Sequence, residues 1–419
     1  MARTELSNQT EARSAGPLLP FFVALVFAWN LAWCEPSSAQ PPKAPVEARS
    51  LFLLTGEKLP LKSLTITKEN VAGEGLPEGL LLDDLRRIEL AGSGPVANKP
   101  TVLVQTLGGG RIAGNSVVVE GDECIVDGTI AGKLSIPLDQ IRAVRLEPQT
   151  ANPEFDKAVS TPSAETDKFF IKVDEGKVDS TTGVLKALGA QDFEFEQEGE
   201  ARKLPRAKLF GFIVAQPSAD DDMTKALVTL RDGSTLGGEV AGLAEGKLTL
   251  MLIGGSQLEI PESAVASIAV RSSRMAFVSD LKPVEEEQRS IAFLDVPWQR
   301  DRSVLGKIMT LGSRTFDKGI GCHAECRLTY ETGGKYDVLA AVIGIDAETL
   351  GKGDCVFTVL GDGESLFTTR VKGSDPPREI QVDLARVKRV TLVVEAGVGL
   401  DLGDHADWCD VRFIKNSKK

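Results

Sequence analysis

The sequence predicts a mostly β protein in which small, strongly bent sheets are followed by a larger C-terminal β-sandwich. Three observations support this fold class. Short stretches of alternating apolar and polar residues, separated by Gly and Asp turns, occupy most of the 419 residues, and no long amphipathic helical pattern occurs. A nine-residue pattern recurs four times before residue 280, and the predicted strands become longer after residue 291.

The first 39 residues are typical of a secretory signal peptide that is cleaved during export. Arginines at positions 3 and 13 provide positive charge, residues 17–33 form an apolar core, and residues 37–39 are a small-residue cleavage site. The apolar run is shorter than the roughly 20 residues of a membrane-spanning helix, so we expect no stable span after cleavage; an uncleaved anchor is the alternative. Residues 40–49 are rich in proline and indicate a linker.

The composition excludes some classes of partner. A net charge of −12 argues against nucleic acid, which would favour a basic surface. Hydrophobic residues make up 42% of the chain, which is enough for packed cores. The cysteines that follow the expected cleavage site show neither zinc-site spacing nor a disulfide framework, so we expect them to be small buried residues.

The nine-residue pattern has an apolar residue at its fourth, seventh and ninth places. Its four copies are residues 82–90, 138–146, 206–214 and 262–270. A proline immediately precedes each of the last three copies, which predicts a one-turn helix that runs into a strand with alternate residues in a core.

Each copy closes a unit of about five short strands. In the last unit, Asp232-Gly233 is a hairpin turn between alternating strands. The strand order predicts a bent sheet or partial barrel and resembles Sm-like or SH3-like small barrels. We expect two units in residues 50–147 and two in residues 169–279, with a linker at 148–168 between the pairs and a solvated hinge at 280–290. Since the units contain no histidine and few aromatic residues, a structural or interaction role is expected.

Longer strands with Gly-rich turns between them make residues 291–415 typical of a single β-sandwich domain. Five blocks in this segment carry a family resemblance: Leu294–Trp298, Lys318–Ala324, Val342–Asp346, Val359–Gly363 and Asp404–Trp408. On these blocks, residues 291–414 resemble the NPCBM domain, a carbohydrate-binding module first noted beside catalytic domains of glycosyl hydrolase family 98. The resemblance implies a galactose-binding-like jelly-roll sandwich with a sugar-binding role. The chain departs from the family in having a shorter loop after Trp298 and cysteines at positions 322, 355 and 409.

A sugar site needs an aromatic face for the apolar side of a pyranose and polar groups for its hydroxyls. The candidate residues for carbohydrate binding are Trp298, His323, Asp346, Asp404, His405, Asp407 and Trp408. A regular strand from Cys409 to Ile414, extended backwards, would place His405 and Asp407 on one face and Trp408 on the other. The alternative interpretation is structural: His405 and Asp407 hydrogen-bond to each other and fix a loop, and Trp298 belongs to the core.

Two further chemistries are weaker hypotheses. Asp346, Asp401, Asp404, Asp407 and Asp410 are potential oxygen ligands for Ca²⁺, but their spacing is irregular, and no other cofactor is expected. A carboxylate pair also suggests glycoside hydrolysis, but no catalytic-domain pattern accompanies it, so we expect no enzymatic activity.

The sequence thus predicts an exported, non-catalytic protein of the periplasm, cell envelope or extracellular space. Its C-terminal sandwich would bind a carbohydrate or polysaccharide, and its N-terminal units would present that sandwich. The alternative is a structural protein of the cell envelope whose sandwich contacts protein partners, and a third possibility is a glycoside hydrolase or an accessory of one.

Overall fold

The computed structural model describes eight segments of the chain: residues 49–68, 70–90, 99–163, 165–173, 177–216, 224–289, 296–398 and 403–416. The predicted signal peptide, residues 40–48 of the predicted linker, the first two residues of the block Leu294–Trp298 and Asp401 lie outside these segments. Nearly all regular structure in them is antiparallel β-sheet, as the sequence predicts, and none of their helices is long and apolar enough to cross a membrane.

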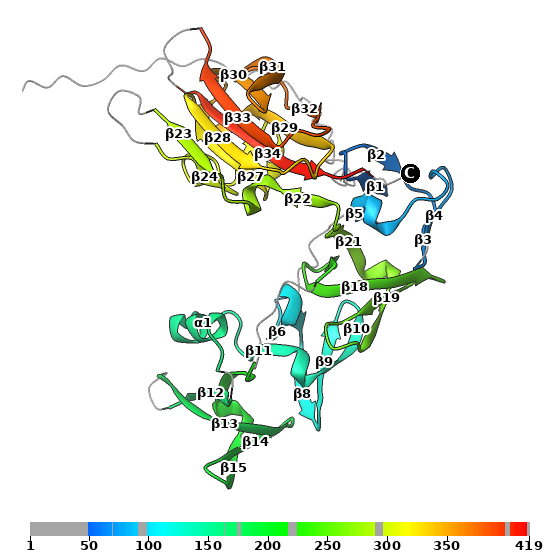
Figure 1. Cartoon of the computed structure of the whole chain (residues 1–419). Helices are drawn as coiled ribbons and strands as arrows, with labels where there is room; N and C mark the ends of the chain where they lie inside the picture. Colours follow the sequence, from blue (N-terminus) through cyan, green and yellow to red (C-terminus); the bar gives the residue numbers. More distant parts are fainter. Residues whose placement is uncertain are drawn as a thin grey trace, which may run out of the picture. The chain divides into compact units, whose positions relative to one another are not determined.

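Four small β units precede the sandwich (Figure 1). Unit A contains β1 (Ser50–Leu53), β2 (Lys58–Pro60), β3 (Thr65–Ile66), β4 (Val71–Ala72), η1 (Leu82–Asp84) and β5 (Leu85–Glu89). Unit B contains β6 (Val102–Thr106), η2 (Leu107–Gly109), β7 (Arg111–Gly114), β8 (Ser116–Glu120), β9 (Glu123–Thr129), β10 (Gly132–Pro137), η3 (Leu138–Gln140) and β11 (Ile141–Arg145).

Units C and D repeat this plan. Unit C contains β12 (Asp167–Lys172), β13 (Val178–Leu188), β14 (Asp192–Gln197), β15 (Glu200–Pro205), η5 (Arg206–Lys208) and β16 (Leu209–Ile213). Unit D contains β17 (Ala226–Leu230), β18 (Thr235–Ala244), β19 (Lys247–Met251), β20 (Gln257–Pro261), η7 (Glu262–Ala264) and β21 (Val265–Val270).

The recurring pattern forms the element that the sequence predicts: a single 3₁₀ turn followed at once by a closing strand. Pro137, Pro205 and Pro261 each occupy the position immediately before the turn, with φ between −57° and −53°. The ring of proline fixes φ in this range, so the residue directs the chain into the turn at little entropic cost. The apolar seventh residue of every copy is fully buried.

The closing strands pair the units in a nested order. β5 of unit A pairs with β21 of unit D, and β11 of unit B pairs with β16 of unit C, all antiparallel. In both pairs the seventh residues of the pattern face each other, Ile88 opposite Ile268 and Val144 opposite Phe212. In each pair, the edges of two equivalent closing strands meet around a local two-fold axis, so the backbone hydrogen bonds of both strands are satisfied. Neither pair of closing strands joins units that are on the same side of residues 148–168.

The predicted linker also contains the helix α1 (Pro153–Ser160), whose Phe155 is fully buried. The Phe155 ring centroid lies 5.0 Å from that of Phe170 and 5.7 Å from that of Phe210. Asn152 caps the helix, since its side chain accepts a hydrogen bond from the Phe155 amide at 2.9 Å. Asn at the N-cap followed by Pro at the first helical position is a common start of a helix.

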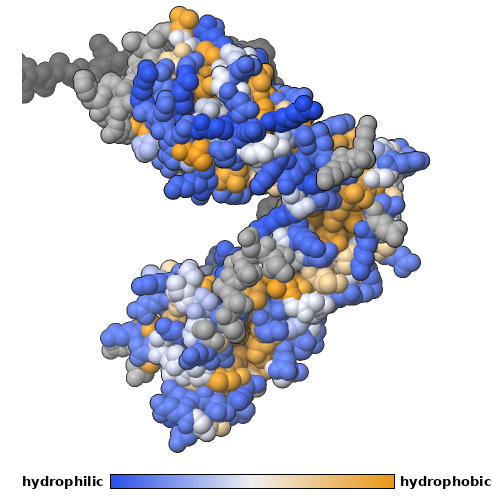
Figure 2. All heavy atoms as spheres, viewed as in Figure 1, coloured by the Kyte–Doolittle hydropathy of each residue, from blue (hydrophilic) through white to orange (hydrophobic). Residues whose placement is uncertain are grey.

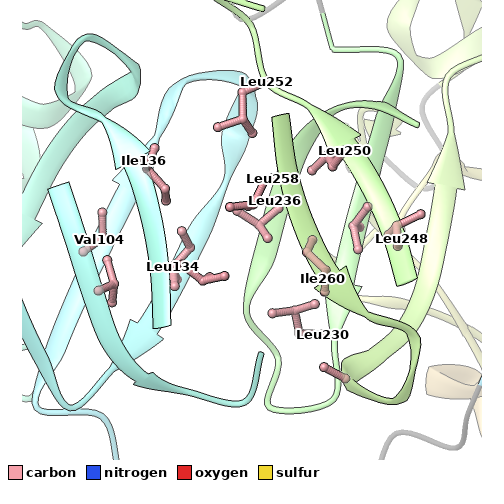
Figure 3. Packing of buried hydrophobic residues seen from close by; sticks show 14 of the residues in the cluster. Val104, Leu134, Ile136, Leu230, Leu236, Leu248, Leu250, Leu252, Leu258 and Ile260 are labelled. Atoms are coloured by element: carbon pink, nitrogen blue, oxygen red, sulfur yellow. The ribbon is translucent and has the colours of Figure 1, made fainter. Parts of the chain in front are cut away.

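One apolar core runs through the units. Figure 3 shows Leu134 of β10 in unit B beside Leu236 and Leu258 of unit D, which belong to the same buried cluster. β18 extends this connection, because it pairs with β7 at Thr235 and with β3 at Leu243. The units therefore share a core, and burial of each such leucine contributes about 1.5–3 kcal/mol relative to exposure.

The sandwich comprises two antiparallel sheets, drawn largely in yellow to red in Figure 1. The first has the order β24 (Gln299–Arg300), β27 (Gly319–His323), β34 (His405–Ile414), β29 (Val338–Ile345) and β32 (Arg378–Asp383), with β22 (Met275–Phe277) also paired to β34. The second has the order β23 (Glu285–Gln288), β28 (Cys326–Glu331), β33 (Arg389–Ala396), β30 (Asp354–Gly361) and β31 (Glu364–Lys372). Three smaller elements are η8 (Val278–Asp280), η9 (Ala347–Thr349) and the hairpin of β25 (Met309–Leu311) and β26 (Arg314–Phe316).

The sandwich begins earlier than the sequence predicts. The described part of the predicted hinge, residues 280–289, is not a solvated linker, because β23 pairs along its whole length with β28. Its three glutamates are exposed on an edge strand, where charge is a common protection against pairing with other chains. Polar and charged side chains cover most of the face of the sandwich seen in Figure 2. The cysteines of the described segments are free and buried, as expected: Cys124, Cys322, Cys326, Cys355 and Cys409.

Replacement of the helix anchor tests the corrected account of residues 148–168. Phe155→Ala should lower the free energy of unfolding by ~3–5 kcal/mol, because it leaves a cavity between Phe170 and Phe210. Denaturant unfolding measures this loss. Lys157→Ala, on the exposed side of the same helix, should change stability by less than about 0.5 kcal/mol. Equal effects of the two substitutions would contradict the packing of α1.

Candidate functional site

Strand β34 carries most of the predicted site residues, but it is not regular. Opposite β29, Ala340 pairs with Arg412 and Val342 with Cys409, so two residues of β34 face one residue of β29. Asp410 has a left-handed φ of 49°, which is typical of such a β-bulge. The bulge reverses the alternation, so the expectation that one face continues from residue 405 to residue 414 is wrong.

The bulge directs Trp408 into the core between the two sheets. Its side chain is 1% exposed, and its ring lies edge-on to Phe357 with centroids 5.1 Å apart. Trp408 therefore offers no stacking face to a sugar, which corrects the prediction made for this residue. His405 and Asp407 lie on the opposite face of the same sheet.

On that outer face a histidine–carboxylate cluster forms, which we define as His323, His405, Asp346, Glu348 and Asp407. His323 and His405 are cross-strand partners on β27 and β34, with ring centroids 5.6 Å apart. Nδ1 of His405 lies 2.9 Å from Oε1 of Glu348. The structure thus brings together four of the predicted residues and adds Glu348.

The turn after β29 positions the carboxylates of this cluster. Oδ1 of Asp346 caps η9 by accepting a hydrogen bond from the Glu348 amide at 2.8 Å. Its Oδ2 accepts one from the Thr310 amide, also at 2.8 Å. Oε2 of Glu348 accepts a hydrogen bond from Ser303 Oγ at 3.1 Å and lies 3.8 Å from Lys307 Nζ. Both carboxylates are therefore fixed before any ligand arrives.

Glycines on both neighbouring strands allow Asp407 to be covered. Gly321 and Gly344 are its cross-strand partners. A Cβ atom at Gly321 would approach the backbone oxygen of Arg302 to 2.3 Å, and one at Gly344 would approach Leu311 to 2.8 Å. Only glycine lets the covering segments lie this close, which gives a packing reason for the glycines in two of the family blocks.

Burial changes the acidity of the cluster. The Asp407 side chain is fully buried, and this burial raises its pKa well above the ordinary value, with further contributions from the adjacent carboxyl group of Asp346 and the charge of Glu348. Burial and the neighbouring acidic groups therefore disfavour the ionised form of Asp407. Its neighbour His405 is partly exposed, with 18% of the side chain accessible.

Two other predicted residues lie outside the cluster. Trp298 is partly buried against the sandwich core, and its Nε1 donates a hydrogen bond to Glu286 of the edge strand β23 at 3.0 Å. Asp404 is buried, and its Oδ1 accepts a hydrogen bond from the Asp354 amide at 2.7 Å. The structural interpretation therefore fits Trp298, Asp404 and Trp408 better than ligand contact does.

Within the described segments, no group of three or more His, Cys, Asp or Glu side chains is arranged to hold a metal ion. Of the aspartates considered for Ca²⁺, Asp410 forms an ion pair with Arg86 and Asp346 bonds to backbone amides. The described residues therefore give the Ca²⁺ hypothesis no support.

Sequence reasoning missed Glu348, Ser303 and Lys307. Glu348 follows the candidate Asp346 by two residues at the end of a predicted strand, so its position was a usable signal. Ser303 and Lys307 are more than forty residues from Glu348 in sequence and no spacing connects them to it. An open cleft of about 500 Å³ has walls from residues 311–314, Gly344, Ile345, Ala347, Gly351 and residues 373–377, so it borders the backbone neighbours of Asp346.

Comparison with known families agrees with this architecture. Residues 274–414 match the family described as NPCBM/NEW2 domain, and the match begins at β22, the first strand paired to β34. The chain carries an NPCBM/NEW2 domain. The family named from the sequence blocks is thereby confirmed, and the NPCBM domain starts before residue 291.

Known proteins share this domain over part of their length. A Renibacterium salmoninarum protein named "Putative endo-alpha-N-acetylgalactosaminidase" is 32% identical over 171 residues, which cover 38% of this chain and 11% of that protein. The chain thus spans about a tenth of the length of this relative. Two structures from Clostridium perfringens are also similar. The CBM51 of GH95 in complex with methyl-galactose is 25% identical (33% of this chain, 99% of that one, TM-score 0.30). The CBM51-2 and INT domains of ZmpB with GlcNAc are 26% identical (41% and 39%, TM-score 0.32).

The different positions of the two tryptophans predict different effects of truncation. Trp408→Ala should lower the free energy of unfolding of the NPCBM domain by ~3–5 kcal/mol, since it empties a fully buried site beside Phe357. Trp298→Ala should cost clearly less, because its ring is partly exposed. Thermal and denaturant unfolding of the two variants measure the difference. A Trp408→Ala protein of wild-type stability would rule out the core position.

The raised pKa of Asp407 predicts a pH-dependent loss of stability. An unfolded aspartate titrates near about 3.9, so above that pH the folded state alone retains the proton. The stabilisation is complete below the unfolded pKa and is lost as the pH rises towards the raised folded pKa. Asp407→Asn removes the titration, so its melting temperature relative to wild type should increase from pH 4 to pH 7. The exposed Glu364→Gln variant should show no such trend, and a pH-independent difference for Asp407→Asn would contradict the assignment.

Proposed function

We propose that this chain is an exported, non-catalytic protein whose NPCBM domain binds carbohydrate and whose β units present that domain. The match of residues 274–414 to the family supports the ligand class. The name of the Renibacterium relative associates the shared segment with a protein that acts on N-acetylgalactosaminides. Export rests on the signal-like N-terminus of the sequence alone.

The observation that carries the proposal is the graded exposure of the histidine–carboxylate cluster. The side chains of Asp346, Glu348 and Asp407 are buried, and hydrogen bonds hold those of Asp346 and Glu348, whereas His405 and Lys307 reach solvent. Polar groups fixed in advance lose little conformational entropy when they bind hydroxyl groups. A small set of oriented polar groups is typical of a small-ligand site, and Ile345 and Ala347, the chain neighbours of Asp346, line an open cleft.

The apolar contacts of this site would be aliphatic. Two exposed aliphatic side chains are close in sequence to the cluster. Ile308 follows Lys307, and Leu350, which is 87% exposed, lies two residues after Glu348. Leu350 also has a left-handed φ of 55° at the end of η9. The left-handed backbone and the exposed apolar side chain of Leu350 both cost free energy in the unbound protein. Contact with the C–H face of a sugar would bury the side chain and offset part of that cost.

The geometry gives no support to hydrolysis by this cluster. Glycosidases place two accessible carboxyl groups on either side of the scissile bond. Here both oxygens of Asp346 accept hydrogen bonds from backbone amides, and Asp407 is completely covered. A glycosidic bond therefore cannot lie between two of these carboxyl groups.

Affinity electrophoresis of the full chain tests this function. The mobility of the protein should fall in gels that contain a suitable neutral polysaccharide. His405→Ala and Lys307→Ala should weaken this retention at least tenfold, which corresponds to about 1.4 kcal/mol. Lys388→Ala, an exposed lysine of the same domain outside the cluster, is the matched control and should behave as wild type.

Two results would contradict the proposal. Absence of retention on every neutral glycan of a broad panel would remove the ligand class, and protein adducts from cross-linking in envelope fractions would then favour an assembly role. Retention that is unchanged in His405→Ala and Lys307→Ala would place the sugar elsewhere on the chain.

A further inference from the structure

A second and larger cleft, of about 1020 Å³, lies between unit A and the NPCBM domain. Its walls come from β1, β2 and β5 on one side and from β22, β26 and β34 on the other. Several contacts hold these walls together: Arg412 Nε donates to the Leu54 carbonyl at 2.7 Å, and Arg86 Nη1 donates to Asp410 at 2.5 Å. Arg274 also forms an ion pair with Asp84.

Two neighbouring guanidinium groups line this cleft, and only one of them is paired with a carboxylate. Arg412 is 3% exposed, and it donates to the carbonyl oxygens of Leu54 and Asp410 but, within the described segments, to no carboxylate. Arg86 pairs with the Asp410 carboxylate, and its buried Nε has no partner among the described residues. Buried charges are normally paired, so one positive charge here is uncompensated.

The other charged groups of the cleft do not remove this excess. The charge of Glu379 favours the protonated form of Arg412, but Glu379 forms its ion pair with Arg314. Glu89 pairs with Arg87. Burial, followed by the charge of Arg86, lowers the pKa of Arg412 to about 10. Glu57 and Asp317 are exposed at the rim, where water and salt screen them.

Aromatic rings lie beside the excess charge. Phe52 is partly exposed in the wall of the cleft, with Lys58 Nζ 5.3 Å and Arg86 Cζ 5.8 Å from its ring centroid. Phe277 lines the same cleft. Lys58 is exposed and forms no ion pair with a described residue, so its charge is available to a ligand.

We propose that this cleft binds an acidic oligosaccharide, whose carboxylate or sulfate group supplies the missing negative charge beside Arg86 and Lys58 while a sugar ring packs against Phe52. The ligand class rests on the proposed function, but the site uses none of the residues of the histidine–carboxylate cluster. An oxyanion with an adjacent apolar ring face matches cations and aromatic rings better than a neutral sugar does. Because the whole chain carries a net charge of −12, non-specific attraction of polyanions is disfavoured.

Affinity electrophoresis of the full chain in gels with polygalacturonate or dextran sulfate tests this site, with neutral dextran and polyglutamate as comparisons. We expect retention on one of the two acidic polysaccharides, which distinguishes carboxylate from sulfate. Retention should weaken at least tenfold in Lys58→Glu and in Arg86→Gln and should decrease with added salt. Lys133→Glu, which makes the same charge change on β10 outside the cleft, should bind as wild type.

Thermal unfolding separates lost binding from lost folding. Lys58→Glu should retain the wild-type melting temperature because Lys58 is exposed. His405→Ala should lose neutral-glycan retention and keep acidic-glycan retention, so the two proposals fail independently. Three results would overturn the acidic-sugar assignment: no retention on either acidic polysaccharide, unchanged retention of Lys58→Glu, or equal retention on polyglutamate. Equal retention on polyglutamate would indicate that the ligand is an acidic peptide.

Discussion

The β-bulge at Asp410 is the constraint on which the C-terminal domain depends. It inserts one residue into β34, the strand that pairs with β27, β29 and β22. Before the bulge, Trp408 enters the core, and Asp407 lies on the outer face; after it, Val411 and Phe413 enter the core, and Arg412 points towards unit A. One local change of register therefore sets the core, the histidine–carboxylate cluster and the contact with the repeats.

Both candidate binding regions contain buried charge or buried acid. In the cluster, covering segments bring three acidic side chains close together. Burial raises the pKa of Asp407, and Asp346 is tied to backbone amides. In the cleft, Arg412 is buried without a carboxylate partner among the described residues, and the partly buried Arg86 pairs with Asp410. Such arrangements rarely stabilise a fold, since the desolvation cost is comparable to the interaction gained.

The β units obey a different constraint, the satisfaction of strand edges. Each unit ends in a strand whose free edge is available for pairing, and the four edges are satisfied in two antiparallel pairs. The outer pair joins unit A to unit D, and unit D continues directly into β22 of the NPCBM domain. Unit A is thereby placed against β34 by strand pairing and by the Arg412 and Arg86 contacts. The repeats form a wall of the larger cleft as well as a support for the domain.

The amino-acid sequence by itself determined the fold class, the repeated turn-and-strand element, the family of the C-terminal domain and four members of the cluster. These features depend on local periodicity and on short blocks such as Lys318–Ala324, which are visible without coordinates. Tertiary structure alone decided the nested pairing of the units, because four similar edges are equally able to pair and only packing selects among them. It also decided the positions of Trp408, Arg412 and Glu348. A bulge leaves no signature in hydrophobic alternation, and residues hundreds of positions apart, such as Leu54 and Arg412, meet only when the chain has folded.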